Sequence, residues 1–107
     1  MSLRLPGSHA HTAPVVALDY EIAQERASAL GRLGRALEAA LAALTDYDNG
    51  HAERDATRAR LVQDASDALW CFMVQRESCG LRDPRPVLRH YGVPADVYAR
   101  MGAFSRR

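Results

Sequence analysis

The chain has 107 residues, of which 48% are hydrophobic and 25% charged, a composition typical of one globular domain. Its formal net charge of +1 lacks the basic excess of proteins that bind nucleic acid or membrane surfaces by charge alone. No apolar run approaches the ~20 residues that cross a bilayer, and no charged start followed by an apolar run predicts a signal peptide.

Residues 1–14 contain proline, glycine and histidine without helical or strand periodicity. We expect this segment to be a flexible N-terminal arm, followed by a single helical domain over residues 15–107. His9 and His11 form a His-x-His pair. Because no third ligand lies near them in the sequence, we expect no metal site.

The segment from about Asp19 to Tyr47 has the spacing of a long amphipathic helix. Leucines recur every seven residues, at Leu30, Leu37 and Leu44. Small residues on the same stripe, such as Gly34, predict the close approach of a partner helix. Asp19 is the expected N-cap, and Asn49-Gly50 supplies residues that readily end a helix.

A second helix is expected from about Glu53 to Cys79. Its main stripe consists of Arg58, Val62, Ala65, Leu69, Phe72 and Arg76. Gly80 followed by Leu81 predicts a Schellman-type end, in which Leu81 folds back onto the last turn. The short Asn-Gly connection makes the two helices antiparallel neighbours.

Proline and glycine residues divide the remaining segment, which is expected to form two short helices. Asp83 is a plausible cap for a helix over Pro84–Tyr91, which ends at Gly92. Another helix begins at Pro94 and ends at Gly102. The predicted fold class is all-α: an antiparallel hairpin of two long helices plus two short C-terminal helices, completed to a bundle by dimerisation.

The dimer is expected because apolar surface is left over. Residues 68–74 read Ala-Leu-Trp-Cys-Phe-Met-Val, so this part of the second helix must be covered on more than one side, by the tail or by a second copy. The first helix also carries alanines on its back face. The predicted interface of a homodimer consists of Ala39, Ala42, Ala43, Trp70, Cys71 and Val74.

Arg76 lies on the apolar stripe of the second helix, where a buried guanidinium needs a carboxylate. In an antiparallel hairpin this position faces the start of the first helix. We therefore expect an Asp19–Arg76 ion pair, with Glu21 or Glu25 as the next candidates. The alternative is that Arg76 extends to solvent near the helix end.

No sequence motif predicts catalytic, cofactor-binding or metal-binding residues, so an enzyme is not indicated. Cys71 and Cys79 lie eight positions apart on one helix, which separates them by ~12 Å. That distance is too great for a disulfide, so free thiols and a cytoplasmic location are expected.

Nucleic-acid binding is the main alternative, because residues 80–107 carry 6 Arg against 2 Asp. The two short helices around Gly92 resemble a helix-turn-helix, although Ala95, Asp96 and Ala99 are poorly suited to reading bases. Exposure of Arg89 and Arg100 would favour DNA or RNA binding. Burial of Tyr91 and Met101 would favour a cap on the hairpin, which is the preferred interpretation.

Binding of a small apolar ligand beside Trp70 and Phe72 is a further alternative. For the whole chain, the favoured function is a homo-oligomeric interaction or regulatory module.

Three blocks resemble a family of small bacterial proteins of unknown function. They are LDYEIAQERASALGRLG (residues 18–34), LWCFMVQRESCGLRD (residues 69–83) and YGVPADVYARMG (residues 91–102). The resemblance covers roughly residues 18–103. It implies a helical domain, and it brings no activity, ligand or catalytic residue with it.

Overall fold

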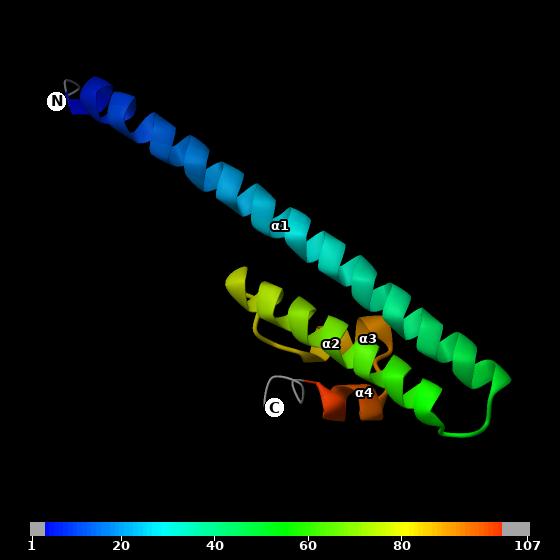
Figure 1. Cartoon of the computed structure of the whole chain (residues 1–107). Helices are drawn as coiled ribbons and strands as arrows, with labels where there is room; N and C mark the ends of the chain where they lie inside the picture. Colours follow the sequence, from blue (N-terminus) through cyan, green and yellow to red (C-terminus); the bar gives the residue numbers. More distant parts are fainter. Residues whose placement is uncertain (1–3, 102–107) are drawn as a thin grey trace.

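The computed structural model describes residues 4–101, with side chains from residue 13 onward. The regular secondary structure of that range is entirely helical. It consists of α1 (Arg4–Gly50), α2 (Ala56–Ser78), α3 (Arg85–Tyr91) and α4 (Ala95–Arg100) (Figure 1). The predicted all-α class, with two long helices followed by two short ones, is therefore confirmed.

Helices α1 and α2 pack side by side as an antiparallel hairpin, joined by residues 51–55 (Figure 1). Helix α1 ends at Gly50, where the sequence predicted its end. Helix α2 begins three residues later than predicted, because Asp55 is its N-cap: Asp55 Oδ1 accepts a hydrogen bond from the Arg58 amide at 3.0 Å.

The start of α1 was wrongly predicted. The helix begins at Arg4 and continues through Pro14, so Asp19 is an interior residue and not an N-cap. The segment expected to be an N-terminal arm therefore has helical backbone from Arg4 onward. Figure 1 shows the consequence: the first half of α1 runs beyond the end of α2 and lies alongside no other helix.

The end of α2 has the predicted Schellman geometry. Gly80 has a φ of 85°, a left-handed conformation that costs glycine little. The Leu81 amide donates to Arg76 O and the Gly80 amide to Glu77 O, each at 2.9 Å. These two bonds turn the chain back along α2 toward α3.

The short helices also begin and end close to the predicted residues. Asp83 Oδ1 accepts a hydrogen bond from the Arg85 amide at 3.1 Å, and Pro84, between them, is the N-cap residue of α3. Helix α3 ends at Gly92, whose φ is 61°. After Pro94 the chain enters α4, which packs against α2 (Figure 1).

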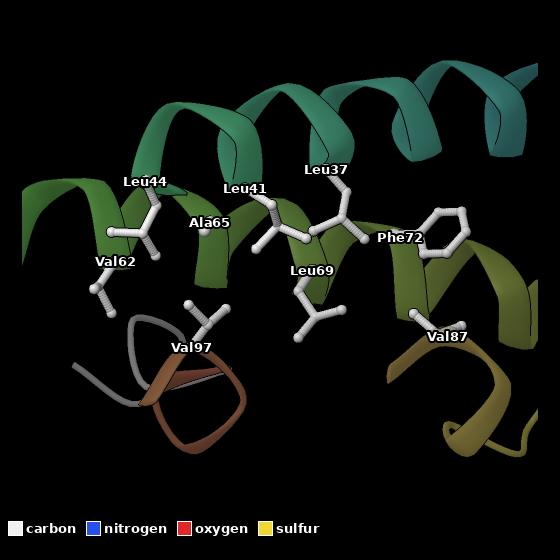
Figure 2. Close-up of a cluster of buried hydrophobic side chains, with 9 residues drawn as sticks. All are labelled: Leu37, Leu41, Leu44, Val62, Ala65, Leu69, Phe72, Val87 and Val97. Carbon is white, nitrogen blue, oxygen red and sulfur yellow. The ribbon is translucent and has the colours of Figure 1, made fainter. Parts of the chain in front are cut away.

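One apolar core joins all four helices (Figure 2). Its buried members are Leu37, Leu41, Leu44, Val62, Ala65, Leu69, Phe72, Val87 and Val97. The predicted stripes of both long helices supply seven of these nine residues, and α3 and α4 supply one valine each. The core therefore occupies only the half of α1 that faces α2.

Candidate functional site

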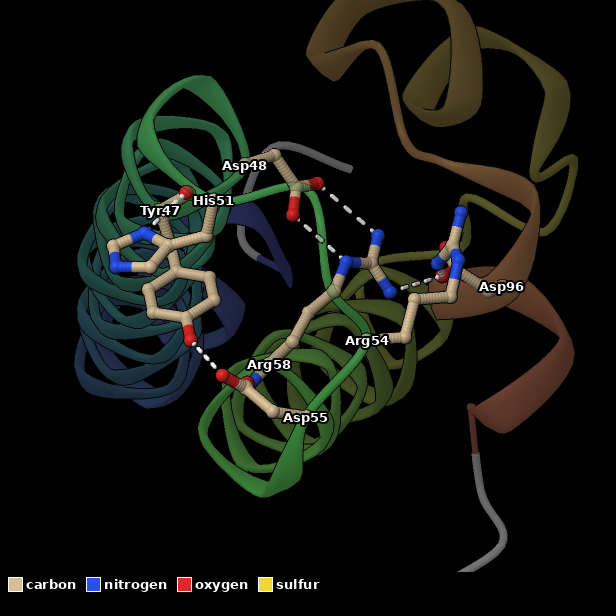
Figure 3. Close-up of polar contacts among 7 residues, drawn as sticks. All are labelled: Tyr47, Asp48, His51, Arg54, Asp55, Arg58 and Asp96. Atoms are coloured by element: carbon tan, nitrogen blue, oxygen red, sulfur yellow. Dashed lines mark hydrogen bonds and ion pairs between the residues drawn. The ribbon is translucent and has the colours of Figure 1, made fainter.

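Arg58 joins three helices at the closed end of the hairpin (Figure 3). Its Nε and Nη2 donate to the two carboxylate oxygens of Asp48, on α1, at 2.7 and 3.1 Å. Its Nη1 donates to Asp96 Oδ2, on α4, at 2.9 Å. The Arg58 side chain is only 12% exposed, whereas the side chains of Asp48 and Asp96 are 39% and 42% exposed.

The charges of this cluster are stable near neutral pH. Hydrogen bonds from Arg58 lower the pKa of Asp48 and of Asp96, and both carboxylates raise the already high pKa of Arg58. Arg54 adds a second, longer ion pair to Asp96 at 3.6 Å. Asp48 and Asp96 are therefore ionised near pH 7, and their hydrogen bonds to Arg58 connect α4 to the hairpin.

Sequence reasoning missed this cluster. The sequence pattern placed Arg58 on the apolar stripe of α2, but no acidic partner was predicted for it. The available signal was the same one that drew attention to Arg76: a charged residue among hydrophobic ones.

Tyr47 and Asp55 close the loop between the long helices. The Tyr47 hydroxyl donates to Asp55 Oδ2, and the Tyr47 ring stacks on His51 with centroids 3.9 Å apart (Figure 3). This hydrogen bond lowers the pKa of Asp55 and raises that of Tyr47. Like the Arg58 cluster, the arrangement holds the fold together.

The unpaired half of α1 exposes a large apolar surface. We call residues 13–28 the overhang; all of its side chains are exposed. Its large hydrophobic residues, each 41–65% exposed, are Val15, Val16, Leu18, Tyr20 and Ile22. Sequence reasoning missed the overhang because it began the helix at Asp19, although a run of four apolar residues, Val15 to Leu18, directly precedes that position.

A shallow groove of about 220 Å³ lies between the last turns of α2, the chain that follows them, and α4. Its apolar lining includes Met73, Val74, Leu81, Pro84, Tyr98 and Met101. Arg76, Glu77 and Arg82 supply its charges. The volume is below the ~300 Å³ at which small-molecule sites usually begin. The groove takes in Trp70, but Phe72 is buried on another face against α1, so the two do not frame one ligand site.

The predicted interface residues fall into two groups. Ala39, Ala42 and Ala43 are exposed on α1. Cys71 and Val74 are exposed on α2, where Trp70 is half-buried beside the groove. The structure thus separates the seven-residue apolar run by environment: Leu69 and Phe72 enter the core, while Val74 remains 49% exposed.

Asp19 and Arg76 are not brought together. Arg76 Nη1 donates to the backbone oxygen of Asp83 at 2.9 Å, and no ion pair between described residues involves Asp19, Glu21 or Arg76. Glu25 pairs with Arg32 on its own helix. The physical reason is the register: Gln75, beside Arg76, reaches Arg26 O at 3.3 Å, so Asp19 lies about 10 Å further along α1.

The two short helices pack as a cap. Val87 and Val97 belong to the core, while Tyr91, Val93 and Met101 are half-buried against it. Arg89 and Arg100 are both exposed, as nucleic-acid binding would require. However, Arg100 Nε donates to Gln63 Oε1 at 3.0 Å, and Asp96 on the same helix is engaged by Arg58.

Within the described residues, no group of three or more His, Cys, Asp or Glu side chains is placed to hold a metal ion. The side chains of His9 and His11 lie outside that range. No helix of the described part is both long and apolar enough to cross a membrane. Cys71 and Cys79 are free thiols.

Comparison with known proteins gives one positive result. Neither the curated proteins nor the solved structures include a match to this chain. The model of DUF6665, a family of unknown function, matches residues 2–107. That match covers the hairpin, both short helices and the overhang, so the chain belongs to the DUF6665 family.

Proposed function

We propose that this chain is a homo-oligomeric interaction module that assembles through apolar surface left open by its own fold. One observation carries the proposal: five of the eight exposed large hydrophobic residues in the described chain lie on the overhang. At 100° per residue, Val15, Leu18 and Ile22 share one face of the overhang, and exposed apolar surface of this kind marks an interaction site. The free thiols Cys71 and Cys79 fit a reducing compartment such as the cytoplasm.

The spacing of the overhang supports a helical partner. Val16 and Ala23 continue the seven-residue series of Leu30, Leu37 and Leu44, whose members pack against α2 further along the helix. Most of the stability of a helix in a protein comes from packing its apolar face. Val15, Leu18 and Ile22 form a second apolar face of the overhang, with the three- and four-residue spacing of a helix contact and no helix of the same chain against it (Figure 1).

Light scattering after size exclusion tests self-association. At micromolar concentration we expect a mass near twice 11.8 kDa. Replacing Leu18 and Ile22 by Glu should give a monomer, because it would place two unpaired charges in the interface. Both residues are exposed, so the monomer fold should survive.

A matched control separates a specific interface from a general effect of added charge. Ala17→Glu with Gln24→Glu adds the same two charges on the opposite side of the overhang, as judged from 100° per residue. This variant should remain dimeric. A wild-type monomer at every accessible concentration would overturn the proposal.

A further inference from the structure

We propose that the overhang of one copy lies in the groove between α2 and α4 of a second copy, and that the contact is reciprocal. This inference rests on the proposed self-association and specifies its geometry. The occupant of the groove is then an acidic, apolar helix from an identical chain.

The exposed hydrophobic residues form two sets. Five lie on the overhang, and the other three of the described chain, Val74, Leu81 and Tyr98, all line the groove. One set projects from a single helix, and the other surrounds a depression. At 100° per residue, Val15, Leu18 and Ile22 share one face of the overhang, and placing this face against the groove covers exposed hydrophobic residues of both sets.

The charges of the two surfaces are complementary. The overhang carries Asp19, Glu21 and Glu25 against Arg26, a net charge of −2. The groove carries Arg76 and Arg82 against Glu77, a net charge of +1. Asp19 follows Val15 by four residues and precedes Ile22 by three, so an acid shares the apolar face that would enter the groove.

The overhang cannot reach the groove of its own chain. Helix α1 is continuous from Arg4 to Gly50, and Figure 1 shows that its first half points away from α2 and α4. The occupant must therefore come from another molecule. Two copies that exchange overhangs satisfy both grooves at once and form a closed, two-fold arrangement.

Reciprocal exchange doubles the length of overhang that is in contact. The overhang of 16 residues spans about 24 Å, and a two-fold arrangement buries this length twice. Stable interfaces bury ~1,200–2,000 Å² in total. A single shallow groove would fall at the weak end of the range of interfaces, whereas two linked grooves reinforce one another.

Complementation between two variants tests the geometry. The overhang variant carries Leu18→Glu and Ile22→Glu, and the groove variant carries Val74→Glu and Arg82→Glu. All four positions are exposed, so both proteins should keep the far-UV circular dichroism of the wild type. Each variant alone should associate at least about tenfold more weakly than the wild type, because each loses both contacts.

Mixing the two variants restores one contact. The intact overhang of the groove variant can enter the intact groove of the overhang variant. Sedimentation velocity of the equimolar mixture should therefore show a heterodimer, weaker than the wild-type dimer, that neither variant forms alone. Ala17→Glu with Gln24→Glu serves as the control and should behave as the wild type.

The outcomes distinguish this inference from the proposed function. A dimer that survives in the groove variant, or two monomeric variants that fail to complement, would overturn the exchange and leave self-association standing. A wild type that is monomeric throughout would overturn both. A heterodimer found only in the mixture would support both.

Discussion

Arg58 illustrates how a single charged side chain on an apolar stripe can unite distant parts of the chain. Its partners lie 10 positions before it and 38 positions after it. The two carboxylates satisfy the guanidinium in a partly shielded setting, where an unpaired charge is costly. The position of α4 thus depends on polar contacts as well as on Val97.

Replacing Arg58 by Met tests this dependence. Methionine keeps an unbranched apolar stem and removes the guanidinium, which leaves Asp48 and Asp96 facing each other without a cation between them. We expect a clear fall in the melting temperature. Arg54→Gln is the control: its side chain is 74% exposed and its ion pair is longer, so the melting temperature should change much less. Equal effects of the two substitutions would contradict the assigned role.

Acid should destabilise the fold through these aspartates. The pKa of Asp83 is lowered to about 2 by hydrogen bonds from Arg85, and those of Asp48, Asp55 and Asp96 are also lowered. A carboxyl with a lowered pKa binds its proton more readily in the unfolded chain. Its contribution to stability is therefore complete above the ordinary value of 3.8 and is lost as the pH falls toward the lowered one.

Urea unfolding at several pH values measures this loss. The free energy of unfolding should fall most steeply below about pH 4 and level off near pH 2. Asp96→Asn should reduce the pH dependence in that window. A stability that does not vary below pH 4 would contradict the lowered pKa values.

Two glycines of α1 should respond differently to alanine. At Gly31 a Cβ atom would meet only Arg35 Nη1, at 3.5 Å, so Gly31→Ala should raise the free energy of unfolding by about 0.5–1 kcal/mol through helix propensity. At Gly34 it would lie 2.9 Å from Tyr91 Oη and 3.2 Å from Phe72 Cε1. Gly34→Ala should therefore not raise the free energy of unfolding. Urea denaturation of both variants measures the difference.

At the scale of the elements, sequence patterns predicted the helix ends that depend on local backbone conformation. Asn49-Gly50, Gly80 and Gly92 mark helix ends because their backbone conformations are locally determined. The start of α1 was missed because residues 1–14 contain proline and glycine without helical periodicity, although Val16 and Ala23 continue the series of Leu30. The Asp19–Arg76 pair was wrong for another reason: Asp19 was chosen because it shares the stripe of Leu30 and Leu37, although it lies seven residues before Arg26, which is level with Gln75.

Helix α4 should behave as part of the core. Val97 is fully buried, so Val97→Ala should lower the free energy of unfolding by about 2 kcal/mol. Tyr98→Ala, at a neighbouring residue that is 42% exposed, should cost much less. Urea unfolding followed by circular dichroism distinguishes the two. Equal small effects would indicate that α4 does not contribute to the folded hairpin.

At the scale of the whole molecule, the chain is an elongated body. Its extents are 73 × 26 × 21 Å and its radius of gyration is 20.2 Å. A compact domain of this length has a radius of gyration of about 13 Å. The sequence could predict that apolar surface remained for a partner, but it placed that surface on Ala39, Ala42, Ala43 and the middle of α2. The overhang was not foreseen, because its exposure depends on where α2 ends relative to α1.

Small-angle scattering should detect this shape. The overhang variant with Leu18→Glu and Ile22→Glu, measured as a monomer, should give a radius of gyration near 20 Å. A value near 13 Å would show that the first half of α1 folds back onto the hairpin, and the apolar face of the overhang would then be covered within one chain.

The length of α1 also has a mechanical consequence. From Arg4 to Ser28 the backbone of α1 extends about 37 Å beyond the part that packs in the hairpin. A tilt of about 10° where this extension meets the packed part moves its far end by about 6 Å, so a slight repacking around Leu37 becomes a large displacement there. Conversely, a partner that binds the far end of α1 and changes the direction of the helix would alter the packing of α1 against α2.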